Sequence, residues 1–81
     1  MWFVYFLKSA NKKWYYVGST NNLERRVEEH NGGKVASTKD YVPLKLVYQE
    51  QFPDEHSARM YEQKVKKQRL LKEDIIRTIE Q

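Results

Sequence analysis

The sequence contains no cysteine, and among its 81 residues only three are glycine and two are proline. The absence of cysteine excludes disulfides, thiolate metal sites, iron–sulfur clusters and a cysteine nucleophile, so stability has to come from packing. The longest apolar run, residues 2–7, has no basic residue before it and is far shorter than the roughly 20 residues of a membrane span. A chain of this length supports one small core. We therefore expect residues 1–81 to form a single domain that is soluble, cytoplasmic and free of membrane contact.

Positive charge is in excess and unevenly distributed. Lysine and arginine outnumber the acids by 15 to 11, a net charge of +4, which makes a polyanion a more natural partner than an acidic protein. Between residues 59 and 72 a single acid, Glu62, is surrounded by six cations: Arg59, Lys64, Lys66, Lys67, Arg69 and Lys72. This run is either the solvated face of a helix or a surface for an anionic partner.

Two apolar segments near the N-terminus predict a β-hairpin. Residues 2–7 are unbroken, aromatic and β-branched, which is typical of a strand covered on both faces and central in its sheet. Residues 9–13 are polar and turn-like, and residues 14–18 follow as a second strand. A four-residue loop would set Tyr5 directly opposite Tyr16.

The rest of the chain predicts one more strand and three helices. The strand covers residues 44–52, and its alternating apolar side chains are Leu44, Leu46 and Tyr48. The first helix covers residues 22–30, with a capping-box-like start at Asn21, and a flexible stretch with two glycines follows it. Two further helices are expected over residues 53–69 and 72–80. The order β-β-α-β-α-α contains no strand–helix–strand crossover, so we predict an α+β fold with a three-stranded antiparallel sheet packed on helices.

Two polar side chains fall on the buried side of the first helix. Its apolar stripe is formed by Leu23 and Val27. At about 100° per residue, Arg26 and His30 lie beside that stripe. Arg26 either extends its stem over the sheet edge into water or has a function, and His30 either answers the helix dipole or has one. Arg25 points the opposite way and stands four residues before Glu29, the spacing of a surface ion pair.

The second helix carries an inward carboxylate. Its apolar stripe is formed by Ala58, Tyr61 and Val65, and Glu62 lies within the same arc. A buried charge is costly unless it is paired or bound to a metal, so Glu62 is either in an ion pair, for instance with Arg26, or a ligand to a divalent cation. Tyr5 and Tyr16, on adjacent strands, fit ordinary cross-strand packing with their hydroxyls at the rim.

In order along the chain, these residues resemble the GIY-YIG nucleases. Phe3-Val4-Tyr5 stands where the first triplet of the family would be, Tyr16-Val17-Gly18 matches the second, and a short hairpin separates them. From Tyr16 onward, the order of residues places Arg26 at the catalytic arginine of the family and His30 one turn later, where members carry Tyr or His. The segment Ala58-Arg59-Met60-Tyr61-Glu62 is similar to the one that bears the metal-binding glutamate.

The resemblance covers about residues 3–69 and is strongest to small stand-alone bacterial members, which are similar to the nuclease module of the excision-repair endonuclease. It implies a metal-dependent endonuclease that hydrolyses phosphodiester bonds in nucleic acid, DNA in preference to RNA, in repair or recombination. The implied catalytic residues are Tyr5, Tyr16, Arg26, His30 and Glu62. Basic residues would contact backbone phosphates; they are Lys34, Lys39, Lys64, Lys66, Lys67, Arg69 and Lys72.

In the implied mechanism, Glu62 holds one Mg²⁺ or Mn²⁺ and Arg26 holds the phosphate through its fork of donors. Tyr5 or Tyr16 is the general base, and His30 relays a proton or orients the base. The sequence departs from the family in three ways. Phe3 replaces a glycine, Ser19 stands where some members carry a lysine, and neither a downstream asparagine nor a separate DNA-binding domain is apparent. Two alternatives therefore stay open: an inactive nucleic-acid-binding module, and a protein-interaction domain whose partner supplies specificity.

Overall fold

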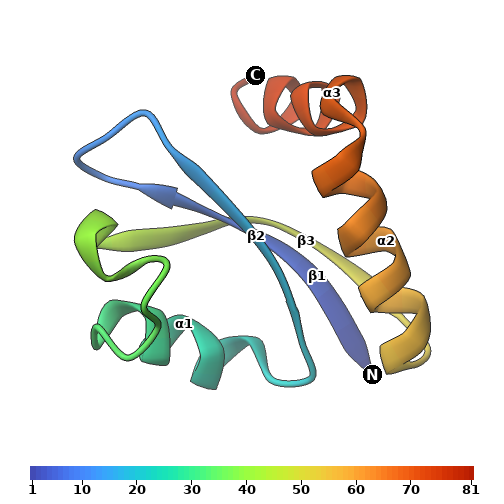
Figure 1. The fold of residues 1–81 in the computed structure, drawn as a ribbon, viewed down its shortest axis with the longest axis horizontal. Coiled ribbons are helices and arrows are strands. Elements are labelled where there is room, and N and C mark those ends of the chain that lie inside the picture. Colours follow the sequence, from blue (N-terminus) through green and yellow to red (C-terminus); the bar gives the residue numbers. More distant parts are fainter.

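A central strand organises the structure, a computed structural model that describes residues 1–81 (Figure 1). Strand β1 (Trp2–Ser9) lies between β2 (Tyr15–Thr20) and β3 (Leu44–Phe52) and is antiparallel to both. The helices are α1 (Leu23–Asn31), α2 (Glu55–Lys67) and α3 (Arg69–Ile79), with a short 3₁₀ helix, η1 (Lys39–Tyr41), before β3. The prediction of an α+β fold built on a three-stranded antiparallel sheet, with the order β-β-α-β-α-α, is confirmed.

Helices cover both faces of this sheet, with α1 on one side and α2 and α3 on the other (Figure 1). Because successive side chains of a strand point to opposite faces, β1 contributes residues to two hydrophobic clusters. The cluster beneath α2 and α3 has as its buried members Val4, Phe6, Val17, Ala58, Val65 and Ile75. The buried members of the cluster on the α1 side are Tyr5, Leu7 and Leu44. This double burial explains why β1 reads as an unbroken apolar run.

The predicted hairpin register is wrong by two residues, since Tyr5 lies opposite Gly18 and not opposite Tyr16. The loop is two residues longer than expected, because Lys8 pairs with Tyr15, and Ser9 organises this longer loop. Its hydroxyl accepts hydrogen bonds from two backbone N–H groups of that loop. A shift of two residues leaves every side chain on its own face of the sheet. Tyr5 and Tyr16 are therefore still neighbours on one face, with ring centroids 6.3 Å apart.

A β-bulge interrupts the alternation of side chains that was predicted for β3. Phe6 pairs with Tyr48, but Leu7 pairs with Leu46, so that Val47 is the extra residue. Leu46 consequently packs on the α1 side, whereas Tyr48 packs on the opposite side against Phe6, with ring centroids 5.5 Å apart.

The helix ends differ from the predictions by a few residues. The N-cap of α1 is Asn22 and not Asn21, because the Asn22 side chain accepts the N–H of Arg25 at 3.1 Å. The glycine stop is confirmed, since Gly33 has φ 74°, which favours glycine. The break between α2 and α3 falls at Gln68, earlier than expected. None of the helices is both long and apolar enough to cross a membrane.

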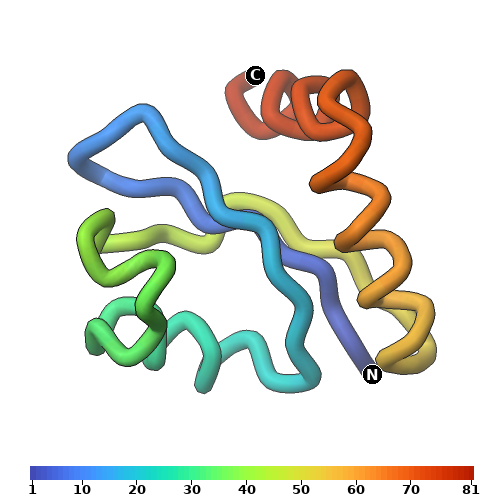
Figure 2. Tube along the Cα trace, in the orientation of Figure 1, coloured from blue at the N-terminus to red at the C-terminus, as the bar shows by residue number.

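The connection from α1 to β3 is tied to the hairpin loop, and Figure 2 shows the two segments side by side. The Ser9 hydroxyl donates to the carbonyl of Tyr41 at 2.7 Å, and the Ala10 N–H donates to the carbonyl of Pro43 at 3.0 Å. Thr38, in the middle of this connection, has no exposed surface. The stretch predicted to be flexible thus contributes a buried residue to the interior.

Candidate active site

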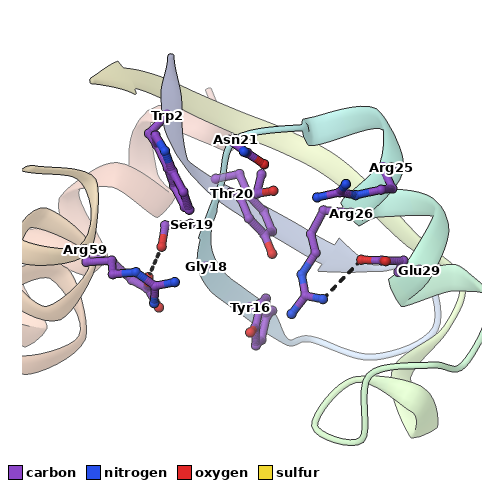
Figure 3. Close-up of a pocket in the computed structure, with 12 residues that line it drawn as sticks. Trp2, Tyr16, Gly18, Ser19, Thr20, Asn21, Arg25, Arg26, Glu29 and Arg59 are labelled. Atoms are coloured by element: carbon purple, nitrogen blue, oxygen red, sulfur yellow. Dashed lines mark hydrogen bonds and ion pairs between the residues drawn. The ribbon is translucent and has the colours of Figure 1, made fainter. Parts of the chain in front are cut away.

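A pocket of about 300 Å³ opens along the edge strand β2 (Figure 3). Four of the five catalytic residues implied by the sequence line it: Tyr5, Tyr16, Arg26 and Glu62. They come from β1, β2, α1 and α2, so the pocket exists only in the folded chain. The fifth, His30, lies behind Tyr5 and is completely buried.

Strand β2 divides the pocket into two sides. Tyr16 packs on the α1 side of the sheet, whereas Ser19, three positions later, reaches α2 on the other. Figure 3 shows Arg26 and Glu29 on one side of β2, with Ser19 and Arg59 on the other. A group that fills this pocket is therefore contacted from both α1 and α2.

Tyr5 and His30 form a buried hydrogen-bonded pair. The Tyr5 hydroxyl lies 3.0 Å from His30 Nε2, and His30 Nδ1 lies 2.8 Å from the hydroxyl of Thr38. Burial raises the pKa of Tyr5 to about 12, although the neighbouring Arg26 acts to lower it. Burial, with a further contribution from the charge of Arg26, lowers the pKa of His30 to about 4. Both side chains are neutral at pH 7, so the reading of His30 as a charged partner of the helix dipole is wrong.

Gly18 lets the Tyr5 phenol lie across β2. A Cβ atom at position 18 would stand 2.6 Å from the Tyr5 hydroxyl oxygen, 2.8 Å from Cζ, and 2.9 Å from Cε2 of Tyr16. Atoms do not approach so closely without something shifting, so any larger residue would displace the phenol. The glycine of the second triplet is thus explained by steric contact with the tyrosine of the first.

Glu62 is held from two directions and is only partly exposed. Ser19 Oγ donates to one carboxylate oxygen at 2.5 Å, and Lys66 Nζ contacts the other at 2.7 Å. The ion pair with Arg26 that the sequence left open is therefore wrong, and Lys66 is the partner. Lys66 Nζ also lies 5.9 Å from the centroid of the Tyr16 ring. A lysine from α2 thus stands near Tyr16, although Ser19 occupies the position on β2 where some family members carry a lysine.

Arg26 forms the ion pair that was expected of Arg25. Arg26, and not Arg25, pairs with Glu29 at 3.2 Å, and both side chains of that pair are about one-third exposed. Arg25 is exposed and also lines the pocket. Arg59 lines it from α2, where it pairs with Glu55 at 2.6 Å. Three guanidinium groups consequently face the pocket.

The predicted nucleic-acid-binding cations are spread over the surface. Lys66 is paired with Glu62, which lines the pocket. Lys34 and Lys39 are exposed on the connection after α1. Lys64 and Lys67 line a separate groove with apolar neighbours on α2. Two lie at the start of α3, Lys72 partly buried and Arg69 paired with Glu73 at 3.1 Å. The structure does not gather the seven residues at one site.

Two residues of the site, Ser19 and Thr38, were not predicted from the sequence. Because side chains alternate along β2, Ser19 faces α2, where its hydroxyl contacts the inward carboxylate of Glu62. The strand alternation together with the inward Glu62 would have identified Ser19 as a residue of the site. Thr38 lies in an irregular segment without hydrophobic periodicity, so its contact with His30 emerges only from the folded structure.

Neither side of the pocket contains a preformed metal cage, because no three His, Cys, Asp or Glu side chains gather anywhere in the structure. Mg²⁺ is commonly held in proteins by one or two carboxylates together with water and substrate phosphates. A single carboxylate, Glu62, in the lining of a pocket that also contains three arginines fits that mode of binding. Lys66 competes for the same carboxylate.

Comparisons with known proteins identify the family and the fold. The profile of the GIY-YIG catalytic domain matches residues 1–74. A UPF0213 protein of Clostridium perfringens is 43% identical over 66 residues, which are 80% of this chain and 70% of the relative. The UPF0213 protein YazA of Bacillus subtilis is 39% identical over 66 residues, 80% of this chain and 66% of that protein.

One solved structure has the same fold. The solution NMR structure of a UPF0213 protein from Bacillus halodurans superimposes with a TM-score of 0.58 at 31% sequence identity. The match covers 96% of this chain and 85% of that one. The names of these relatives state no activity. The chain therefore belongs to the GIY-YIG family, whose domain defines a superfamily of nucleases.

Proposed function

We propose that the protein is a metal-dependent endonuclease that hydrolyses phosphodiester bonds in nucleic acid, with DNA as the favoured substrate. The observation that carries the proposal is the pocket on β2, where a guanidinium from α1 and a carboxylate from α2 face the same space as two tyrosines. Family membership supports the reaction class. A role in DNA repair, a cytoplasmic location and a single-domain organisation stay predictions.

The charges of the pocket suit a phosphodiester. Arg25, Arg26 and Arg59 supply three cations, against which stand Glu29 and Glu62. A guanidinium fork matches the geometry of phosphate oxygens and stabilises the charge that builds on them in the transition state. Arg26 is the strongest candidate for this role, because it also adjoins the Tyr5 phenol, whose pKa it acts to lower.

The attacking water needs a base, and the Tyr5–His30 pair supplies a route for its proton. A phenol whose pKa is raised to about 12 is a poor base by itself. With His30 behind it, the water proton passes to the Tyr5 oxygen while the proton of Tyr5 passes to His30 Nε2. The P–O bond to the leaving oxygen breaks as the water oxygen bonds to phosphorus. Tyr5 therefore never has to exist as a free phenolate.

The charge of the substrate helps this transfer. Arg26 contributes to the low pKa of His30, so a phosphate bound by Arg26 would offset that repulsion and make His30 a better acceptor. A divalent cation held by Glu62 would supply further stabilisation of negative charge on the phosphate and the leaving oxygen. Ser19 would keep one carboxylate oxygen of Glu62 oriented through its 2.5 Å hydrogen bond.

The proposal is tested by measuring cleavage and binding on the same substrates. Supercoiled DNA, branched DNA and RNA are incubated with the full chain in Mg²⁺, in Mn²⁺ and in chelator. We expect cleavage that requires the metal, and we expect Glu62→Gln to bind nucleic acid without cleaving it. Glu28→Gln is the control, because Glu28 is an exposed acid outside the pocket lining and pairs with none of the pocket arginines.

The same experiment separates the alternatives. Salt-sensitive binding without cleavage by the wild-type protein would instead indicate an inactive nucleic-acid-binding module. Neither binding nor cleavage would indicate a protein-interaction domain. Equal cleavage by the wild-type protein and by Glu62→Gln would point to a contaminating nuclease and overturn the proposal.

A further inference from the structure

A line of three buried polar side chains runs from the pocket into the protein interior. Tyr5 is 1% exposed, and His30 and Thr38 have no exposed surface. The Tyr5 hydroxyl contacts His30 Nε2, and His30 Nδ1 contacts the Thr38 hydroxyl. Thr38 comes from the connection between α1 and β3 and is not among the residues that line the pocket. The side-chain contact that Thr38 makes in the interior is therefore with His30.

The direction of these hydrogen bonds follows from counting hydrogens at Thr38. A threonine hydroxyl has one hydrogen and can accept through its oxygen. The backbone carbonyl of Val35, which also accepts from the N–H groups of Thr38 and Lys39, lies 3.4 Å from the hydroxyl oxygen and can take that hydrogen. In this arrangement the oxygen of Thr38 accepts from His30 Nδ1 at 2.8 Å, which places the imidazole hydrogen on Nδ1. A neutral imidazole has one N–H, so Nε2 then carries a free lone pair.

The other end of the line agrees with this assignment. Tyr5 adjoins the guanidinium of Arg26, which donates hydrogen bonds and cannot accept them. The hydrogen of the Tyr5 hydroxyl consequently has His30 Nε2, at 3.0 Å, as its acceptor. Proton donation thus runs from Tyr5 to His30 and from His30 to Thr38, and no buried side-chain polar atom is left without a partner.

We propose that Thr38 is a positioning residue that holds His30 in the Nδ1-protonated tautomer, so that Nε2 is free to take the proton of Tyr5. The catalytic consequence of this assignment rests on the endonuclease function proposed above. The logic is that of a base whose second nitrogen is fixed by a third group, which sets both the tautomer and the ring orientation. The tautomer itself is a property of the resting protein and does not depend on any activity.

The test uses Thr38→Val, which keeps the shape of the side chain but removes the hydroxyl, and Thr38→Ser, which keeps the hydroxyl. Ser37→Ala is the control, because it removes an exposed hydroxyl from the adjacent position. Two-bond ¹H–¹⁵N correlation spectra of the His30 ring report the tautomer at pH 7. We expect the Nδ1–H pattern in the wild-type protein, in Thr38→Ser and in Ser37→Ala, and a shift toward the Nε2–H pattern in Thr38→Val.

Cleavage of supercoiled DNA by the same four proteins tests the catalytic consequence. We expect Thr38→Val to lower kcat about 10- to 100-fold with little change in KM, as for the loss of part of a general base, and Thr38→Ser to recover most of it. An Nε2–H pattern in the wild-type protein, or an unchanged pattern and rate in Thr38→Val, would overturn this inference and leave the proposed endonuclease function standing. Absence of cleavage by the wild-type protein would overturn the proposed function, while the spectra would still decide the tautomer.

Discussion

His30 makes the stability of the fold depend on pH in a calculable way. The ring has no exposed surface, and the charge of Arg26 adds to the effect of burial, while Glu29 opposes it weakly. Its pKa is lowered from 6.5 to about 4. The unfolded chain therefore takes up a proton near pH 6.5, whereas the folded chain takes it up only near pH 4. Stability from neutral His30 is complete at neutral pH and is lost as the pH falls through this window.

The size of the loss follows from the separation of the two pKa values. Each pKa unit corresponds to about 1.4 kcal/mol, so the free energy of unfolding should fall by about 2 kcal/mol between pH 7 and pH 5, and by about 3 kcal/mol at pH 4. For a small domain whose total stability is of the order of 5–15 kcal/mol, this is a large fraction.

Urea unfolding followed by tryptophan fluorescence at pH 7, 6 and 5 measures the effect. Other groups also titrate in acid, so the informative quantity is the difference between the wild-type protein and His30→Gln, which stays neutral throughout. That difference should shrink by about 2 kcal/mol from pH 7 to pH 5. His56→Gln, which removes the exposed second histidine, is the control substitution. Parallel profiles for the wild-type protein and His30→Gln would refute the reasoning.

Two further predictions concern the pocket. Gly18→Ala should displace the Tyr5 phenol and lower cleavage by up to about 100-fold, because a Cβ would lie 2.6 Å from its oxygen; initial rates measure this, and wild-type activity would contradict it. Lys66→Met should bind Mn²⁺ about two- to fivefold more tightly in the absence of nucleic acid, because it removes a competitor 2.7 Å from Glu62. Titration calorimetry measures this affinity, with Lys64→Met as the control; equal affinities in the two variants would count against the competition.

Much of the fold could be predicted because local pattern and burial agree. The bounds of β3, residues 44–52, were predicted correctly, and the unbroken apolar run identified β1 as central. The hairpin register was not predictable from spacing alone. It depends on hydrogen bonds that the Ser9 hydroxyl makes within the loop, which lengthen the loop without changing the hydrophobic pattern. The bulge at Val47 is likewise set by pairing with β1.

The candidate site was partly predictable because polar residues at buried helix positions are conspicuous. That argument singled out Arg26, His30 and Glu62, which the fold then brings to one strand edge or just behind it. It could not identify their partners. Glu62 pairs with Lys66, four residues later on the same helix, and not with Arg26, because α1 and α2 lie on opposite faces of the sheet. Thr38 reaches His30 from a segment whose sequence has no periodicity.

The most direct test of the endonuclease proposal is the single-turnover rate of supercoiled DNA nicking in Mg²⁺ by the wild-type protein, Glu62→Gln and Glu28→Gln. If Glu62 and Arg26 act on one phosphate from the two sides of β2, Glu62→Gln should be slower by about 100-fold or more, and Glu28→Gln should match the wild-type rate. Equal rates for the wild-type protein and Glu62→Gln, or an equal loss in both variants, would contradict the account.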